Sequence, residues 1–290
     1  MNKYKIFSNA KINIGLNVFQ KESDGYHNID SIMAPIDLYD EMDVTFYSED
    51  GELKIECSDS SIPTDEKNIL FKTYKIFFEN LKKENEKIDI SLKKNIPSEA
   101  GLGGGSSNAA FFLKLLNEHY GNIYNENELE ELAMKIGSDV PFFIKNKTAR
   151  VGGKGNKVEL IENNLKDSII LIKPLDFGIS TKEAYNSFDN LKEVKYANFD
   201  EIIENLKIGN RIALENNIEN SLEQGILETN IEVKMFKMTL SSVVSGKKFF
   251  MSGSGSTYYT FVTELEKSQI ETRLKTFVDN VKIIICKTIN

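Results

Sequence analysis

The segment AGLGGGSSNAA, residues 100–110, places four glycines and two serines directly before the apolar stretch FFLKLL. Upstream, apolar residues alternate with polar ones over residues 88–92, which predicts a strand. Downstream, the apolar spacing predicts a helix from about residue 106 to residue 119. Glycines at such a junction let successive backbone N–H groups turn toward one point, and the helix N-terminus adds the positive end of its dipole. The segment therefore has the properties of a phosphate-binding loop.

Three other interpretations of this segment compete with a phosphate-binding loop. Ser106 or Ser107 can serve only as a helix N-cap, which would suit an isolated pair of glycines. A Walker A loop needs a lysine after the last glycine, where this chain has Ser106. A dinucleotide fingerprint has a different spacing, and we expect the preceding strands to be antiparallel rather than part of a βαβ unit. The segment thus indicates a triphosphate site of a distinct kinase class.

Length and charge limit the remaining possibilities. The 290 residues suffice for two domains, which we place at 1–160 and 161–290, with the boundary in the glycine-rich and polar region near 152–166. A net charge of -8 argues against general binding to nucleic acids or anionic membranes, which use a basic field. No apolar run suits a signal peptide or a membrane span. Cys57 and Cys286 lie far apart, which favours two reduced thiols, no metal site at these cysteines and a cytoplasmic location.

Local patterns predict the other elements. Alternation from Lys11 to Phe19 predicts a half-buried strand, and residues 24–31 read as a turn. Strands at 43–47 and 52–57 flank Asp50 and Gly51, so an antiparallel opening sheet is the simplest expectation. Asn68 is expected to cap a helix that reaches about residue 81. Further helices are expected at 126–136, between 181 and 240 and at 264–277, and further strands at 168–174, 247–251, 258–262 and 281–286.

The segment PSEAGLGGGSSNAA (97–110) resembles the phosphate loop of the GHMP kinases. Four further segments resemble the branch of that superfamily whose substrate is 4-diphosphocytidyl-2-C-methyl-D-erythritol: AKINIGLNV (10–18), DGYHNIDSIMAPIDLYD (24–40), GSDVPFF (137–143) and MSGSGSTYY (251–259). The resemblance implies an α+β fold with a mixed α/β N-terminal domain and a ferredoxin-like C-terminal domain. It also implies ATP-dependent phosphorylation of that substrate's 2-hydroxyl, in non-mevalonate isoprenoid synthesis.

The resemblance assigns two catalytic residues. Asp139 is expected to accept the proton of the substrate hydroxyl, and Lys11 to lie beside it, keep its carboxylate ionised and stabilise charge on the migrating phosphoryl group. Taken alone, Asp139 could simply cap a helix with Pro141 in its first turn, and Lys11 could be a solvated strand residue. The two motifs together favour the catalytic roles.

The resemblance also assigns the substrate side of the site. Tyr26 is expected to stack on the cytosine ring, His27 to meet the polar edge of that ring, and Tyr185 to be the second stacking aromatic. Asn13 shares a strand face with Lys11 and can hydrogen-bond the substrate. Without the family, Tyr26 and His27 read as surface turn residues, and Tyr185 as an equally good helix core residue.

The same resemblance implies two glycine motifs around ATP. The residues expected to bind ATP are Pro97, Ser98, Glu99, Ala100, Gly101, Leu102, Gly103, Gly104, Gly105, Ser106 and Ser107. The third glycine motif of the family, expected to support that loop and also to form a tight turn, consists of Gly253, Ser254, Gly255 and Ser256. ATP and Mg²⁺ are the expected cofactors, with Ser107 a candidate metal contact.

Some features depart from the pattern or leave a choice open. Ser98 and Glu99 stand where many relatives have small or apolar residues, and an acid beside a triphosphate is unfavourable unless it points outward or binds a cation. Arg150 and Lys154 have no assigned partner. The alternatives to the leading function are another GHMP kinase, of the homoserine or mevalonate type, and an inactive nucleotide-binding relative.

Overall fold

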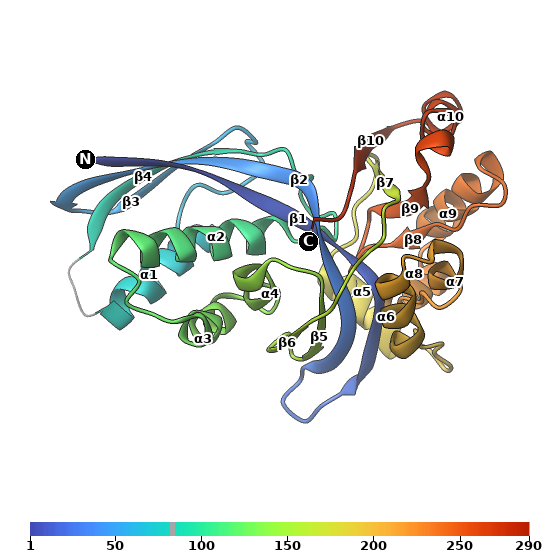
Figure 1. Ribbon diagram of the computed structural model, residues 1–290, viewed down its shortest axis with the longest axis horizontal. Coiled ribbons are helices and arrows are strands. Elements are labelled where there is room, and N and C mark those ends of the chain that lie inside the picture. Colours follow the sequence, from blue (N-terminus) through green and yellow to red (C-terminus); the bar gives the residue numbers. More distant parts are fainter. Residues whose placement is uncertain (82–84, 290) are drawn as a thin grey trace. The chain divides into compact units, whose positions relative to one another are not determined.

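Two long strands open the chain, and each contributes residues to both compact units of the protein. β1 spans Asn2–Lys21 and β2 spans His27–Asp50 (Figure 1). The structure is a computed structural model that describes residues 1–81 and 85–289. Unit 1 comprises Met1–Ala10, Leu38–Pro97 and Gly103–Asn146, and unit 2 comprises Lys11–Asp37, Ser98–Leu102 and Lys147–Asn290. The division of the chain into domains after residue 160 stays a prediction.

The sheet of unit 1 contains a parallel pair of strands. β3 (Leu53–Cys57) pairs in parallel with β4 (Glu86–Lys93), and α1 (Ile69–Leu81) lies in the connection between them. Parallel neighbours need such a crossover, because the chain must return to the end from which it started. β4 also pairs antiparallel with residues 41–50 of β2. The expected hairpin at Asp50 and Gly51, the fully antiparallel opening sheet and the exclusion of a βαβ unit are therefore wrong.

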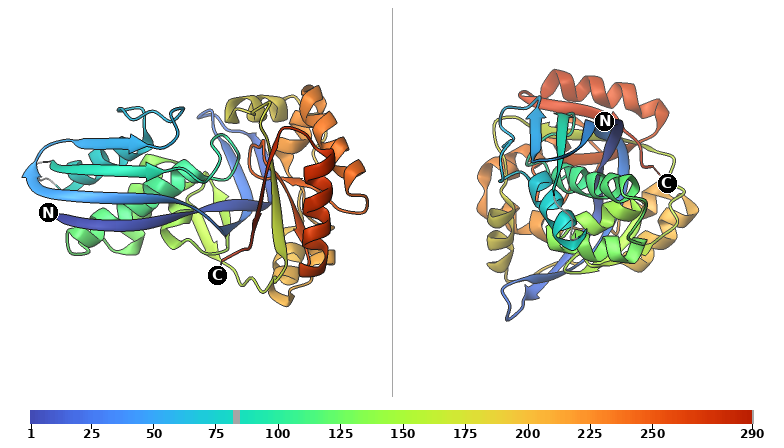
Figure 2. Two further views of the ribbon diagram at one scale, coloured as in Figure 1. Left: turned by 90° about the horizontal axis from the view of Figure 1, so that it is seen from above. Right: turned by 90° about the vertical axis from the view of Figure 1, so that its left-hand side faces the viewer.

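The helices of unit 1 cover one face of its strands (Figures 1 and 2). Besides α1 they are α2 (Gly104–His119), α3 (Glu126–Ile136) and α4 (Val140–Lys145). Asn68 caps α1 as predicted, since its Oδ1 accepts the N–H of Leu70 at 3.0 Å. α3 has its predicted bounds, whereas α2 begins two residues before the predicted 106. Phe46, Phe77 and Phe112, each fully buried, show how phenylalanine supplies the aromatic packing of this core.

Unit 2 holds a second, antiparallel sheet in the order β10-β7-β9-β8. Its strands are β7 (Ser168–Pro174), β8 (Phe250–Met251), β9 (Tyr258–Val262) and β10 (Val281–Cys286). All were predicted with these bounds except β8, which is shorter than residues 247–251. Every residue of β7 is buried, as its continuous apolar run predicts.

In the same unit, residues 29–33 of β2 pair with β5 (Ala149–Gly153), which pairs with β6 (Lys157–Leu160).

Six helices of unit 2 have described bounds, and all lie where helical spacing was predicted. They are α5 (Thr181–Asp189), α6 (Phe199–Ile208), α7 (Arg211–Glu215), α8 (Ser221–Thr229), α9 (Ile231–Val243) and α10 (Glu264–Phe277). Apolar residues of β7, β9, α8, α9 and α10 share one buried cluster. With two sheets and helices in both units, the α+β prediction is confirmed.

The second half of β1 is buried on both faces, so its prediction as a half-buried strand is wrong. Lys11 and Asn13 are each 3% exposed, although they lie on the polar face. The buried polar groups are hydrogen-bonded, as burial requires. Asn17, for example, donates to the Ala197 carbonyl at 3.1 Å and accepts the Ala197 N–H at 2.7 Å. The interpretation of Lys11 as a solvated strand residue fails for the same reason.

The turn before β2 is shorter than the sequence predicts. Residues 23–25 form the turn before β2, so the predicted turn at 24–31 is too long, because His27 already belongs to the strand.

Both cysteines are free thiols, and burial raises the pKa of Cys286. Among the helices described, none has the length and apolar character that a bilayer crossing requires.

Candidate active site

A buried lysine is the centre of a polar cluster in unit 2. The Nζ of Lys11 donates to the carbonyl oxygen of Gly101 at 2.9 Å and to Oδ1 of Asn13 at 2.5 Å. The backbone N–H of Lys11 donates to the carbonyl of Leu102 at 2.9 Å. Asn13 is fixed in turn, because its Nδ2 donates to Oγ of Ser31 at 2.8 Å. These contacts hold an ammonium group against residues 101 and 102 of the predicted phosphate loop.

The turn between β8 and β9 packs against the same loop residues. Ser252 Oγ donates to the Gly101 carbonyl at 2.9 Å and accepts the Asn13 N–H at 3.4 Å. A Cβ on Gly101 would lie 1.9 Å from the Ser252 carbonyl oxygen, and a Cβ on Gly253 would lie 3.1 Å from Lys11 Nζ. Both glycines have a left-handed backbone, with φ of 69° and 55°. We call Lys11, Asn13, Gly101, Ser252 and Gly253 the Lys11 cluster.

The start of α2, in unit 1, carries the other part of the glycine segment. Gly103 is the N-cap, with φ of 70°, and no side chain makes a capping hydrogen bond there. The first N–H groups of a helix have no acceptor within the helix, so this end suits an anion. The interpretation of Ser106 or Ser107 as the N-cap is wrong, because both already lie inside the helix. The Oγ of Ser107 is buried and has no hydrogen-bond partner in the described part of the chain, which fits a hydroxyl whose partner is a ligand.

Asp139 lies at the N-cap position of α4 in unit 1. Pro141 stands in the first turn of that helix, as the sequence suggested. The Asp139 side chain makes no capping hydrogen bond. The purely structural interpretation of Asp139 as a cap therefore lacks the bond that would define it.

The residues expected on the cytosine side come from β2 and α5 of unit 2. The His27 ring lies 5.0 Å from the Tyr185 ring, measured between centroids, and is tilted by 42°. His27 Nδ1 lies 2.8 Å from the carbonyl of Phe19, and Nε2 lies 3.3 Å from Oδ1 of Asp189. The His27 side chain is 6% exposed, so it is not the idle surface histidine of a turn. Tyr185 is half-buried at the edge of the apolar cluster.

The structure shows partners for Arg150 and Lys154, which the sequence alone did not identify. Tyr26 is 66% exposed, and Lys154 Nζ lies 5.5 Å from the centroid of its ring. Lys154 also forms an ion pair with Asp24. Arg150 donates from Nε and Nη2 to both carboxylate oxygens of Asp30, at 2.9 and 2.7 Å, which raises the pKa of the guanidinium.

Comparison with known proteins identifies the family of the chain. Residues 68–147 match the family model described as the GHMP kinases N terminal domain. Over all 290 residues the chain is 88% identical to the 4-diphosphocytidyl-2-C-methyl-D-erythritol kinase of Fusobacterium nucleatum subsp. nucleatum, covering 99% of that protein. The chain belongs to the family of these kinases. The kinase of the same name from Clostridium beijerinckii is 38% identical over 92% of this chain and 93% of its own length.

Solved structures show the same fold. A crystal structure of 4-(cytidine 5'-diphospho)-2C-methyl-D-erythritol kinase superposes with a TM-score of 0.78 at 24% identity, covering 98% of this chain and 99% of the other. Homoserine kinase from Cytophaga hutchinsonii superposes with a TM-score of 0.72 at 17% identity, covering 100% of this chain and 98% of the other. At these identities the likeness establishes the GHMP kinase fold and no more. The predicted fold and family are thereby confirmed, and ATP-dependent phosphorylation follows from the family.

Sequence patterns did not indicate a buried ion pair that precedes the predicted phosphate loop, in unit 1 of this kinase. Asp40 is fully buried and pairs with Lys94, whose ammonium would lie 3.2 Å from a Cβ on Gly104. Asp40 also accepts the N–H groups of Asn95 at 2.8 Å and Ile96 at 2.9 Å. A positive charge is thus fixed beside the first residue of α2. The available signal was the run KKN directly before Ile96 and Pro97.

Mg²⁺ is the metal ion that phosphoryl transfer from ATP normally uses. Over residues 1–81 and 85–289, no three His, Cys, Asp or Glu side chains gather as a metal cluster. Mg²⁺ in kinases keeps several waters and binds substrate phosphates with only one or two protein oxygens, so it does not need such a cluster. The hydroxyl of Ser107, which has no hydrogen-bond partner among the residues that the structure describes, is a suitable oxygen at the start of α2. The residues present therefore fit an ion that arrives with ATP.

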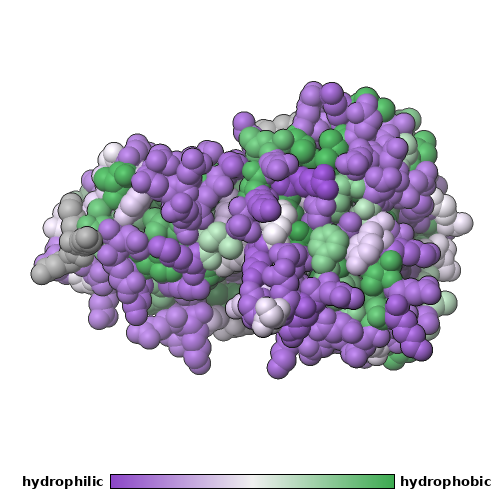
Figure 3. All heavy atoms as spheres, turned by 90° about the horizontal axis from the view of Figure 1, so that it is seen from below, coloured by the Kyte–Doolittle hydropathy of each residue, from purple (hydrophilic) through white to green (hydrophobic). Residues whose placement is uncertain are grey.

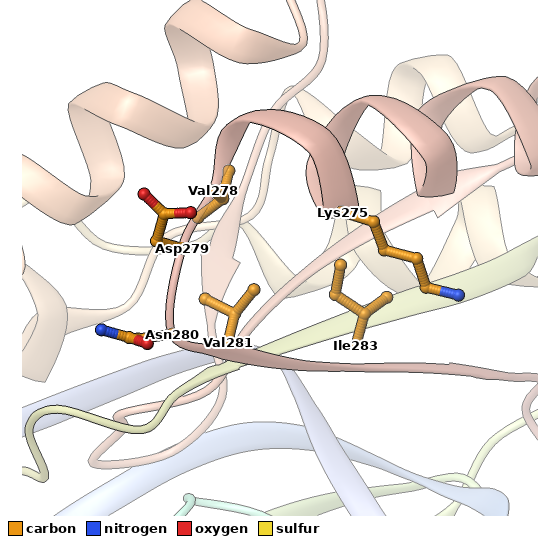
Figure 4. Close-up of a pocket in the computed structure, with 6 residues that line it drawn as sticks. All are labelled: Lys275, Val278, Asp279, Asn280, Val281 and Ile283. Carbon is orange, nitrogen blue, oxygen red and sulfur yellow. The ribbon is translucent and has the colours of Figure 1, made fainter.

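Unit 2 also has a hollow away from the Lys11 cluster. A small hollow lies where α10 leads into β10, and it is lined by Lys275, Val278, Asp279, Asn280, Val281 and Ile283 (Figure 4). The charged ends of Lys275 and Asp279 point away from each other there, so they do not converge on a ligand. On the face drawn in Figure 3, hydrophilic side chains predominate, as the 28% of charged residues leads one to expect.

Proposed function

We propose that this kinase transfers the terminal phosphoryl group of ATP to the 2-hydroxyl of 4-diphosphocytidyl-2-C-methyl-D-erythritol. The observation that carries the proposal is the buried ammonium of Lys11, which is held against Gly101 of the glycine segment. The shared name of the close relatives supplies the substrate. Non-mevalonate isoprenoid synthesis is the corresponding pathway.

The phosphates of ATP are proposed to bind along residues 97–107. The uncapped start of α2 and the charge of Lys94 both favour an anion there. The third glycine motif, residues 253–256, supports this loop through the contacts of the Lys11 cluster. Mg²⁺, with Ser107 as a protein ligand, would supply positive charge to the phosphate oxygens. Because the reaction consumes ATP, we place it in the cytoplasm.

Asp139 and Lys11 are proposed to act on the reacting atoms. The substrate's 2-hydroxyl oxygen attacks the terminal phosphorus of ATP, the bond from that phosphorus to the bridging oxygen breaks, and ADP leaves. Asp139 accepts the hydroxyl proton, and the Lys11 ammonium stabilises negative charge as it moves between the oxygens. Asn13 keeps the lysine oriented and is proposed to bind the substrate as well.

The cytidine end is proposed to lie between Tyr26 and Tyr185, with His27 at the polar edge of the base. The exposed ring of Tyr26 and the half-buried ring of Tyr185 offer flat apolar surfaces. The close approach of the His27 and Tyr185 rings supports placing them in one site. We retain no second candidate function, since mevalonate and homoserine offer nothing for these rings to stack on.

A coupled ATP-consumption assay tests the proposal. Purified protein is given the cytidylyl substrate, homoserine or mevalonate, each with Mg²⁺ and ATP. We expect ADP release with the cytidylyl substrate alone, together with a phosphomonoester on its 2-oxygen detected by phosphorus NMR. Faster turnover of homoserine or mevalonate, or a phosphate on another oxygen, would overturn the assignment.

A further inference from the structure

Lys173 is a buried cation that the proposed chemistry does not use. It lies near the end of β7 in unit 2 and is 9% exposed. Its Nζ donates to Oγ of Ser256 at 2.7 Å and to the carbonyl oxygens of Pro174 at 3.0 Å and Phe177 at 3.4 Å. An ammonium has three hydrogens, so these acceptors saturate it. The lysine therefore holds protein groups and has no donor left for a ligand.

All three acceptors of Lys173 are neutral oxygens, which is unusual for a buried charge. Burial lowers the pKa of Lys173, and the charge of Glu99 opposes that shift. A Cβ on Gly178 would lie 3.7 Å from Oε2 of Glu99. The Glu99 carboxylate therefore lies close to the backbone of Gly178, the residue after Phe177. The acid and the lysine thus lie near one short segment, residues 177–178, within unit 2.

Both ends of this arrangement belong to glycine motifs of the proposed ATP site. Glu99 is an exposed member of the segment 97–107, where a carboxylate is unfavourable beside phosphates. Ser256 belongs to the turn that also carries Ser252 and Gly253 of the Lys11 cluster. An uncharged donor at position 173 could keep the hydrogen bond to Ser256, but it would supply no positive charge to offset the negative charge of Glu99.

We propose that Lys173 is a positioning residue for ATP, which offsets the charge of Glu99 and fixes Ser256 in the third glycine motif. This inference rests on the proposed function, because it takes residues 97–107 to be the ATP-binding loop. It explains how this chain keeps an acid at position 99, the departure from the family noted in the sequence.

Coupling between the two charges is the measurable consequence. Lys173→Met removes both the positive charge and the hydrogen-bond donors, whereas Lys173→Gln removes the charge and keeps a donor. Each substitution is made in two backgrounds, the parent with Glu99 and the Glu99→Gln variant. We expect Lys173→Met to raise the KM for ATP about tenfold, with a smaller change in kcat. Lys173→Gln should raise the KM for ATP clearly in the Glu99 background and hardly at all in the Glu99→Gln background. The KM for the cytidylyl substrate should stay close to that of the parent throughout.

A second lysine serves as the matched control. Lys247 is 10% exposed at its side chain, and its Nζ donates to Glu266 at 2.8 Å and to the carbonyl of Phe261 at 3.3 Å. Lys247→Met should lower the melting temperature without changing the KM for ATP. If Lys173→Met does not fold, the Lys173→Gln pair gives the same comparison.

Two results would overturn the inference about Lys173. One is a KM for ATP that stays at the parent value in the Lys173→Gln variant. The other is a rise of equal size with Glu99 and with Gln at position 99, since the charges would then be uncoupled. A parent protein that does not turn over the cytidylyl substrate would instead contradict the proposed function, so the two failures are distinguishable.

Discussion

The ammonium of Lys11 donates a hydrogen bond of 2.9 Å to the carbonyl oxygen of Gly101. The two residues are 90 positions apart in the sequence, and each lies in a motif that resembles the same kinase family. Their contact ties the proposed electrostatic group for phosphoryl transfer to the proposed ATP loop, within unit 2. Changes at either residue should therefore affect catalysis.

Lys11→Met is expected to lower kcat by about a hundredfold to a thousandfold, because it removes the charge proposed to stabilise the migrating phosphoryl group. The measurement is steady-state kinetics with ATP and the cytidylyl substrate, beside a melting curve. Lys114→Met is the control, since Lys114 Nζ also donates to a backbone carbonyl, that of Ile144 at 3.1 Å. The control should lose stability and keep kcat. Equal kcat values in the two variants would contradict the role of Lys11.

Gly101→Ala is expected to impair both stability and turnover. The new Cβ would lie 1.9 Å from the Ser252 carbonyl oxygen, so the loop and the β8–β9 turn must separate. Gly246→Ala is the matched control, because Gly246 also has a positive φ, of 83°, but no atom of the described residues lies within 4 Å of its Cβ position. The control should cost only the backbone strain, about 1 kcal/mol in urea unfolding. Similar losses in both variants would mean that the close approach to Ser252 is unimportant.

Asp139→Asn is expected to abolish most turnover and to lower the free energy of unfolding far less, because asparagine has nearly the same size and shape as aspartate. The amide cannot accept the hydroxyl proton, and no capping bond of α4 is lost. Kinetics and urea unfolding of the same preparation separate the two effects. A variant as active as the parent would remove Asp139 from the role of base.

Helices and strands with strong local signals could be predicted from the sequence. α3 begins at a capping box formed by Asn125 and Glu128, and α10 begins at one formed by Thr263 and Glu266. Both helices have their predicted bounds, because caps and apolar spacing are local properties. The strand pairing of β3 was not predictable in this way. Asp50 and Gly51 suggest a hairpin locally, whereas β3 finds its partner in β4, beyond α1.

The same difference between local signals and long-range contacts applies to the candidate site. The glycine segment is recognisable because strand, glycines and helix follow one another in the chain. The burial of Lys11 and Asn13 depends on residues far away, such as Ser252, and a polar face in a strand normally indicates solvent. Lys94 was missed for a similar reason, since its partner Asp40 lies 54 residues earlier.

The sheet of unit 1 should have an acid-sensitive contact at Glu41. Hydrogen bonds from Lys93 and then Lys5 lower the pKa of Glu41 to about 2, from an ordinary value of 4.5. A carboxylate with a lowered pKa in the folded state stabilises the protein above pH 4.5, and that contribution is lost as the pH falls toward 2. Glu41→Gln should therefore lower the urea midpoint at neutral pH and have less effect in acid.

Urea midpoints of parent and variant across that pH range provide the check on Glu41. Glu79→Gln is the control, because within residues 1–81 and 85–289 the ion pair of Glu79 is an exposed one, with Lys75 at 4.0 Å. The control should shift the midpoint little at any pH. A difference between parent and Glu41→Gln that is the same in acid and at neutral pH would contradict the assignment.

A crystal structure of the protein with a non-hydrolysable ATP analogue, Mg²⁺ and the cytidylyl substrate would show where the phosphates bind. We expect the triphosphate on the backbone N–H groups of residues 101–107, with its terminal phosphorus between the Lys11 ammonium and the substrate's 2-oxygen. Phosphates bound elsewhere, with residues 101–107 touching no part of the nucleotide, would contradict it.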